Sequence, residues 1–116
     1  MTGTAPIEFD ALLVMFGGDR QITGTLLATF AEELSADIVA AEQALIQQDP
    51  EALRRIAHRI KGTSANLQAT LLSAAARELE QACSEATEAV RAIKHRVMLD
   101  QAKSVRDAIE AWSMAG

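Results

Sequence analysis

The reactive side chains that stand out are two histidines, His58 and His95, because an imidazole can be a nucleophile, a proton carrier or a metal ligand near neutral pH. On a helix that advances about 100° per residue, His58 lies roughly 140–150° from the apolar direction of its segment. That direction is set by six positions: Leu53, Ile56, Ala57, Ile60, Ser64 and Leu67. We therefore expect His58 to face solvent.

The charge around His58 is unlike that of the rest of the chain. Residues 1–51 contain nine acids and one base, whereas residues 52–77 contain five bases and no acid. Four of these bases lie close to the histidine: Arg54, Arg55, Arg59 and Lys61. Nearby positive charge favours a bound or developing anion, so an anion at His58 is chemically reasonable.

Small residues follow His58 on the same helical face. Gly62 comes four residues later, one turn along the helix, and Ala65 follows in the next turn. A glycine inside a helix costs about 1 kcal/mol relative to alanine. The missing bulk would let the backbone of another protein approach the imidazole closely.

Composition excludes several function classes. The net charge of −5 argues against general nucleic-acid binding, which needs Lys and Arg to neutralise phosphates. The single cysteine, Cys83, cannot form an internal disulfide and is expected to lie in the core. The apolar run over 11–16 is too short to span a membrane. These observations favour a cytoplasmic protein that binds neither nucleic acid nor membrane.

The elements that must position His58 are helices. The chain lacks tyrosine and contains no alternating β-branched run, which predicts an all-α fold. Apolar periodicity and punctuation predict a short leading helix and four longer helices, over about 6–16, 19–48, 50–67, 70–84 and 87–114. Connections this short favour an antiparallel, up-down-up-down four-helix bundle forming one domain over 1–116.

Individual positions in the final helix follow from the same pattern. In the final helix we expect one apolar stripe to face the core, formed by Val90, Ile93, Val97, Val105, Ala108 and Trp112. His95 lies between Lys94 and Arg96 and is expected to be solvated on a polar face.

The residues His58–Leu67 read His-Arg-Ile-Lys-Gly-Thr-Ser-Ala-Asn-Leu. They closely resemble the motif of histidine-containing phosphotransfer (HPt) domains of bacterial and plant two-component phosphorelays. That motif is His, any residue, Leu or Ile, Lys, Gly, two small residues, two variable residues and an apolar residue. The segments 16–19 and 49–57 look like the usual lead-in of this family.

The resemblance implies that His58 accepts a phosphoryl group from a receiver-domain aspartyl phosphate and passes it to another receiver. Lys61 would neutralise charge on the transferring group, and Gly62 would give clearance. The divalent metal would belong to the receiver, so no cofactor of this chain is expected. The chain would be a carrier rather than an enzyme. Its partners would be response-regulator receiver domains, a hybrid sensor histidine kinase, or both, and it is expected to be monomeric.

The arginines and Ala65 are candidate partner-binding residues. Arg54, Arg55 and Arg59 would steer and orient an acidic receiver. For Arg54 and Arg55 an alternative stands beside this role, in which they balance Glu51 and the helix dipole.

One position departs from the family motif. Many members have glycine directly after the final apolar residue, where this chain has Gln68. If a left-handed residue ends the helix there, Gln68 or Asn66 must adopt that conformation, at roughly 1 kcal/mol above glycine.

Two other function classes compare differently with the residues present. A metal or haem bundle would need inward histidines or paired ligand motifs, which the sequence lacks. A helical interaction module that binds a signalling partner without being phosphorylated would have a similar surface.

Overall fold

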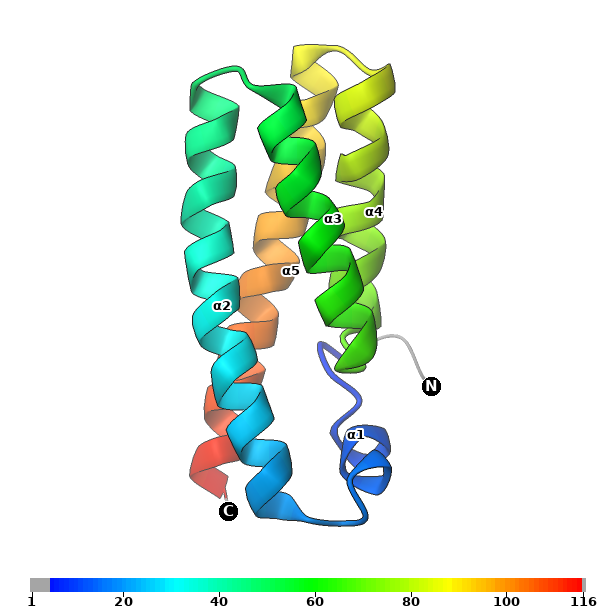
Figure 1. Ribbon diagram of the computed structural model, residues 1–116, viewed down its shortest axis with the longest axis vertical. Helices are drawn as coiled ribbons and strands as arrows, with labels where there is room; N and C mark the ends of the chain where they lie inside the picture. The colour runs from blue at the N-terminus through cyan, green and yellow to red at the C-terminus, as the bar shows by residue number, and fades with distance from the viewer. Residues whose placement is uncertain (1–4, 116) are drawn as a thin grey trace.

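A computed structural model describes residues 5–115, and within that range it contains five α-helices and no strand (Figure 1). The helices are α1 (Phe9–Met15), α2 (Arg20–Ile46), α3 (Pro50–Asn66), α4 (Thr70–Glu85) and α5 (Glu88–Ala115). The prediction of an all-α chain is confirmed, and the four long helices begin and end within two residues of the predicted bounds. Helix α1 is shorter than predicted.

Two aspartates cap the N-termini of the long helices α2 and α3. The Asp19 side chain accepts a hydrogen bond from the Ile22 backbone N–H at the start of α2. Asp49 does the same for Ala52 at the start of α3, where Pro50 occupies the first turn. Both arrangements satisfy backbone donors that a helix N-terminus leaves without a partner.

The four long helices surround one core. Helix α3 packs against α2 and α4, and α5 packs against the same two helices from the other side. In Figure 1 the chain reverses direction at each of the three connections between these helices. Helix α3 therefore has one face in the core and its opposite face in solvent.

The N-terminal segment ties the ends of two helices together. The Glu8 backbone N–H donates to the Gln68 carbonyl just after α3, at 3.1 Å. The Phe9 ring stacks on Trp112 of α5 with centroids 5.7 Å apart, and Arg20 lies 3.9 Å from the Trp112 ring. The contacts of Glu8 and Phe9 hold α1 at the lower end of the molecule in Figure 1, below the end of α3.

The apolar stripe predicted for the first half of α5 is wrong. Val90, Ile93 and Val97 are 38%, 61% and 46% exposed, whereas His95 and Met98 are buried. The second half of the helix buries Ala102, Val105 and Ile109. The first half of α5 therefore faces the core with His95 and Met98, and the face formed by Val90, Ile93 and Val97 is turned toward solvent. None of the helices within residues 5–115 is both long and apolar enough to cross a bilayer.

Gln68 takes the left-handed conformation after α3, with φ of +62°. The Ala69 N–H donates to the Ser64 carbonyl and the Gln68 N–H to the Ala65 carbonyl, which satisfies the last carbonyls of the helix. Of the two residues considered for this conformation, Gln68 rather than Asn66 adopts it. The strain lies at the turn and leaves His58, ten residues earlier, on regular helix.

Gln68→Gly is expected to raise the free energy of unfolding by roughly 0.5–1 kcal/mol, because glycine adopts positive φ without a steric cost. Urea denaturation followed by Trp112 fluorescence measures this change. Gln68→Ala is the matched control and should give no gain, since alanine keeps the strain. Equal stability of the glycine and alanine variants would contradict the assignment of strain to this turn.

Candidate functional site

Helix α3 presents His58 to solvent because the apolar residues of this helix lie on its opposite side. Five of the six predicted core positions are buried, and the sixth, Leu67, packs against the core from its edge. The His58 side chain is 63% exposed. The predicted direction of His58 is confirmed, and the residue lies within the regular helix α3.

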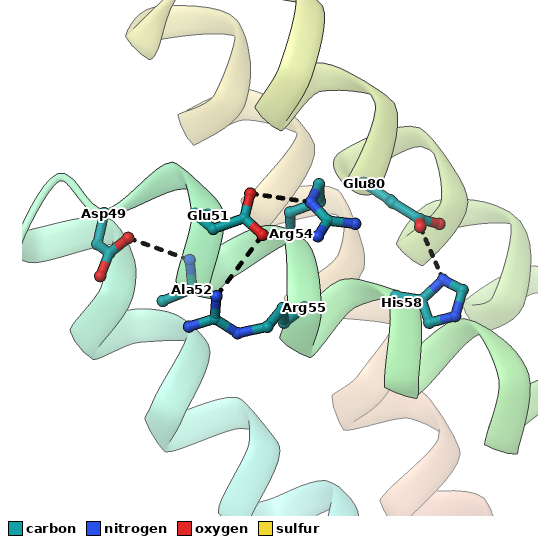
Figure 2. Close-up of polar contacts among 7 residues, drawn as sticks. All are labelled: Asp49, Glu51, Ala52, Arg54, Arg55, His58 and Glu80. Carbon is teal, nitrogen blue, oxygen red and sulfur yellow. Dashed lines mark hydrogen bonds and ion pairs between the residues drawn. The ribbon is translucent and has the colours of Figure 1, made fainter.

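A carboxylate from the neighbouring helix holds the imidazole. The Nδ1 atom of His58 lies 2.7 Å from Oε2 of Glu80 on α4, as Figure 2 shows. The other oxygen of the same carboxylate, Oε1, lies 2.8 Å from Nζ of Lys61. One carboxylate therefore connects the histidine and the lysine that the sequence placed one turn apart on α3.

The charge state of Glu80 determines which ring nitrogen of His58 carries the proton and which carries the lone pair. The hydrogen bond from Lys61 lowers the pKa of the Glu80 carboxyl, partial burial acts in the opposite direction, and the hydrogen bond with His58 lowers the pKa again. An ionised carboxylate only accepts hydrogen bonds, so Nδ1 must donate its proton to Glu80. The neutral ring then has its lone pair on Nε2, which is the nucleophilic nitrogen.

Arg54 and Arg55 gather around an acid at the start of α3 (Figure 2). Arg54 donates two hydrogen bonds to Glu51, at 3.1 and 2.6 Å, and Arg55 lies 3.6 Å from the same carboxylate. The hydrogen bond from Arg54 lowers the pKa of Glu51. The alternative in which these arginines balance Glu51 is thus the arrangement observed, and both guanidinium groups remain partly exposed.

Arg59 points to the opposite flank of α3. Its guanidinium pairs with the Asp37 carboxylate of α2 at 2.5 Å, and this hydrogen bond raises the pKa of Arg59. Three acids from outside residues 52–77, namely Asp37, Glu51 and Glu80, therefore pair with the four bases near His58. The basic segment of the sequence is largely neutralised in the folded chain.

The surface beyond His58 is open. Gly62 and Ala65 are both exposed, and a Cβ atom added at Gly62 would meet nothing within 4 Å. Glycine at this position is therefore not required by packing inside the chain. Its absence of a side chain leaves room next to the imidazole for a group from outside.

His95 differs from its prediction. It is 6% exposed, and burial lowers its pKa, with a further lowering from Arg96 and an opposing effect of Glu42. The predicted polar face was wrong because Lys94 and Arg96 flank the ring while the ring itself points inward. His95 is part of the core, and His58 is the histidine that solvent reaches.

The described residues 5–115 contain no group of three or more histidine, cysteine, aspartate or glutamate side chains arranged to hold a metal ion. The free thiol of Cys83 is buried, and this burial raises its pKa. Beside His58 lies the Glu80 carboxylate, which hydrogen-bonds to the imidazole and pairs with Lys61 through its other oxygen.

Sequence reasoning missed Glu80 and Asp37. Both acids flank the apolar stripes of their helices, at positions that can lie beside a neighbouring helix. That flanking position was a signal that they could reach another helix. It did not indicate which helix they would meet.

One comparison with known proteins, against models of protein families, gave a match. A model of the Hpt domain matches residues 25–113, a range that contains α3, α4 and most of α2 and α5. Neither curated proteins nor solved structures gave a match. Hpt domains carry out histidine phosphotransfer in phosphorelays and interact with receiver domains and histidine kinases. The match covers most of the chain, and its range contains the exposed His58. The chain belongs to the Hpt domain family.

Proposed function

We propose that this chain is a histidine phosphocarrier, which accepts a phosphoryl group on His58 from the aspartyl phosphate of one receiver domain and passes it to the aspartate of another. The observation that carries the proposal is the exposed imidazole whose Nδ1 is held by Glu80. This contact leaves Nε2 facing outward with a lone pair. Membership of the Hpt family supports the same role.

The transfer step follows from this arrangement. The Nε2 lone pair attacks phosphorus, the bond from phosphorus to the aspartyl oxygen breaks, and its electron pair leaves with the receiver carboxylate. The Nδ1 proton stays on the ring, hydrogen-bonded to Glu80. Positioning and charge neutralisation dominate phosphoryl transfer, and a divalent metal is expected in the receiver, so this chain needs no cofactor of its own.

Lys61 and Gly62 have separate roles in the proposal. Lys61 lies one turn from His58 and is 32% exposed, so its ammonium can turn from Glu80 toward a phosphoryl group on Nε2. Its positive charge would stabilise the anionic group in transfer. Gly62 would give the receiver clearance, and the exposed Ala65 would extend that surface.

The role of the helical scaffold in this function is to position His58 and Glu80. We propose one domain, an up-down-up-down four-helix bundle, that holds α3 straight and supplies Glu80 from α4. Acting as a monomeric carrier in the cytoplasm, it would bring His58 to its receivers or to a hybrid sensor kinase. No nucleotide site is needed, because the incoming phosphoryl group is already activated as an acyl phosphate.

The test is incubation of the purified chain with a phosphorylated receiver domain. The expected product is an acid-labile, base-stable phosphate on the chain, as a phosphohistidine requires. Binding of the receiver without any label on the chain would overturn the proposal and leave the unphosphorylated interaction module. Loss of the phosphate from the receiver at the same rate as gain on the chain confirms direct transfer.

Because the four bases near His58 are paired with acids, electrostatic steering is expected to be modest. Arg54→Ala with Arg55→Ala should lower the transfer rate at low salt by about two- to fivefold and reduce its dependence on ionic strength. Stopped-flow measurements over a salt series check this. Lys103→Ala on α5 is a control that removes one exposed charge from a helix that is not a direct neighbour of α3 in the bundle. A salt dependence equal to that of wild type in the double variant would contradict any steering by these arginines.

A further inference from the structure

Glu80 is in contact with the imidazole on the side away from the reacting nitrogen. Its Oε2 atom lies 2.7 Å from Nδ1 of His58, and its side chain is 18% exposed. Its second oxygen is engaged by Lys61. The carboxylate is therefore fixed by two partners on α3 and remains charged beside the ring.

The Nδ1 proton matters most after the phosphoryl group has been received. With phosphorus bonded to Nε2 and a proton on Nδ1, the ring carries a formal positive charge. When the phosphoryl group departs, the electron pair of the N–P bond returns to Nε2 and the ring leaves as neutral imidazole. A ring that has lost the Nδ1 proton must leave as an imidazolate anion, which is a much poorer leaving group.

We propose that Glu80 is a positioning residue that retains the Nδ1 proton on the phosphorylated ring and so keeps the phosphoryl group ready for onward transfer. This inference rests on the proposed function of His58 as the carrier. It assigns to Glu80 a role in donating the phosphoryl group, in addition to orienting the ring that accepts it.

Other charges near the ring come from three helices. On α3, Lys61 shares the Glu80 carboxylate, and Arg54 is paired with Glu51 and lies within the electrostatic influence of Glu80. On α4, Arg77 lies one turn before Glu80. On the other flank, Asp37 and Glu33 of α2 interact with Arg59. Glu80 is the negative group in hydrogen-bond contact with Nδ1, and the nearby cations act against retention of the ring proton.

This charge arrangement predicts opposite effects for the two members of the Glu80 and Lys61 pair. Glu80→Gln keeps a carbonyl oxygen that can accept the hydrogen bond from Nδ1–H but removes the negative charge. Lys61→Gln removes a positive charge that opposes protonation. Each substitution breaks the same ion pair, so a purely structural role would move both variants in the same direction.

The experiment uses phosphoramidate, a small reagent that phosphorylates imidazoles without a partner protein. The phosphorylated wild type and variants are followed by ³¹P NMR from about pH 5 to about pH 9, and the hydrolysis rate is plotted against pH. This rate should fall as the ring loses its Nδ1 proton. Glu78→Gln is the matched control, because Glu78 is on the same helix but pairs with Lys94 of α5.

In Glu80→Gln the midpoint of the profile should lie about half to one pH unit lower than in wild type. This corresponds to hydrolysis about three- to tenfold slower on the alkaline side. In Lys61→Gln the midpoint should lie higher, and in Glu78→Gln it should not move. Coincident profiles of Glu80→Gln and wild type, or shifts of the same sign in the Glu80 and Lys61 variants, would overturn the inference.

The same proteins distinguish this inference from the proposed function. Transfer from a phosphorylated receiver tests whether His58 is the carrier, whereas phosphoramidate tests the chemistry of the ring without a receiver. Labelling by phosphoramidate with no labelling by receivers would overturn the carrier function, and with it the onward-transfer role of Glu80. Labelling by both with unshifted profiles would overturn only the role of Glu80.

Discussion

His58→Gln is expected to abolish the acid-labile phosphate that a phosphorylated receiver places on this chain, to below about one per cent of the wild-type level. Glutamine is a good helix former, so an exposed site on α3 should tolerate it with little change in stability. It lacks a ring nitrogen with a nucleophilic lone pair. Label is measured by autoradiography after acid and base treatment.

The second histidine supplies the contrast. His95→Gln alters a buried residue and should lower the free energy of unfolding by about 1–3 kcal/mol. Under conditions where this variant is folded, it should be labelled to the same extent as wild type. Label that survives in His58→Gln, or that disappears from folded His95→Gln, would contradict the assignment of His58 as the acceptor.

Gly62→Gln is expected to slow transfer from a receiver by about tenfold or more, because small displacements of the reacting groups are costly in transfer reactions. Side chains on a helix lean toward the preceding turn, so a residue at position 62 covers the surface over His58. Within the chain there is room for it, since an added Cβ meets nothing within 4 Å. Transfer rates are measured with the same phosphorylated receiver.

Two further measurements on Gly62→Gln, its stability and its labelling by a small reagent, show whether slower transfer comes from lost clearance or from a damaged fold. Gly62→Gln should raise the free energy of unfolding by roughly 0.5–1 kcal/mol, since glycine is a poor helix former. Labelling by phosphoramidate should be nearly unchanged, because that reagent needs little space. Ala92→Gln, an exposed helical site on α5, is the control for added bulk. A variant at position 62 that accepts phosphate from the receiver as fast as wild type would refute the clearance role.

Much of the fold could be predicted because local signals were strong and consistent. Asp49 and Pro50 predicted the start of α3, and both act there as expected. The apolar stripe of α3 identified its buried side and therefore the exposed side that carries His58. These features depend on residues within a few turns of one another, so the sequence contains the information directly.

The failure in α5 has a physical cause. This helix has apolar residues on more than one side, so that Val97 and Met98 are neighbours in sequence but only Met98 is buried. Periodicity alone could not decide which side faced the core, and the charges of Lys94 and Arg96 suggested the wrong environment for His95. Packing against α2 and α4 selects the buried side.

By itself, the sequence determined the exposed position of His58, the lysine and glycine that accompany it, and the all-helical class. Only the tertiary structure decided that Glu80 meets Nδ1 of His58 and that Asp37 meets Arg59. These partners are each 22 residues apart in the chain. Which flanking acids reach α3 depends on how neighbouring helices are placed and rotated around the core, and the pattern along a single helix does not contain that information.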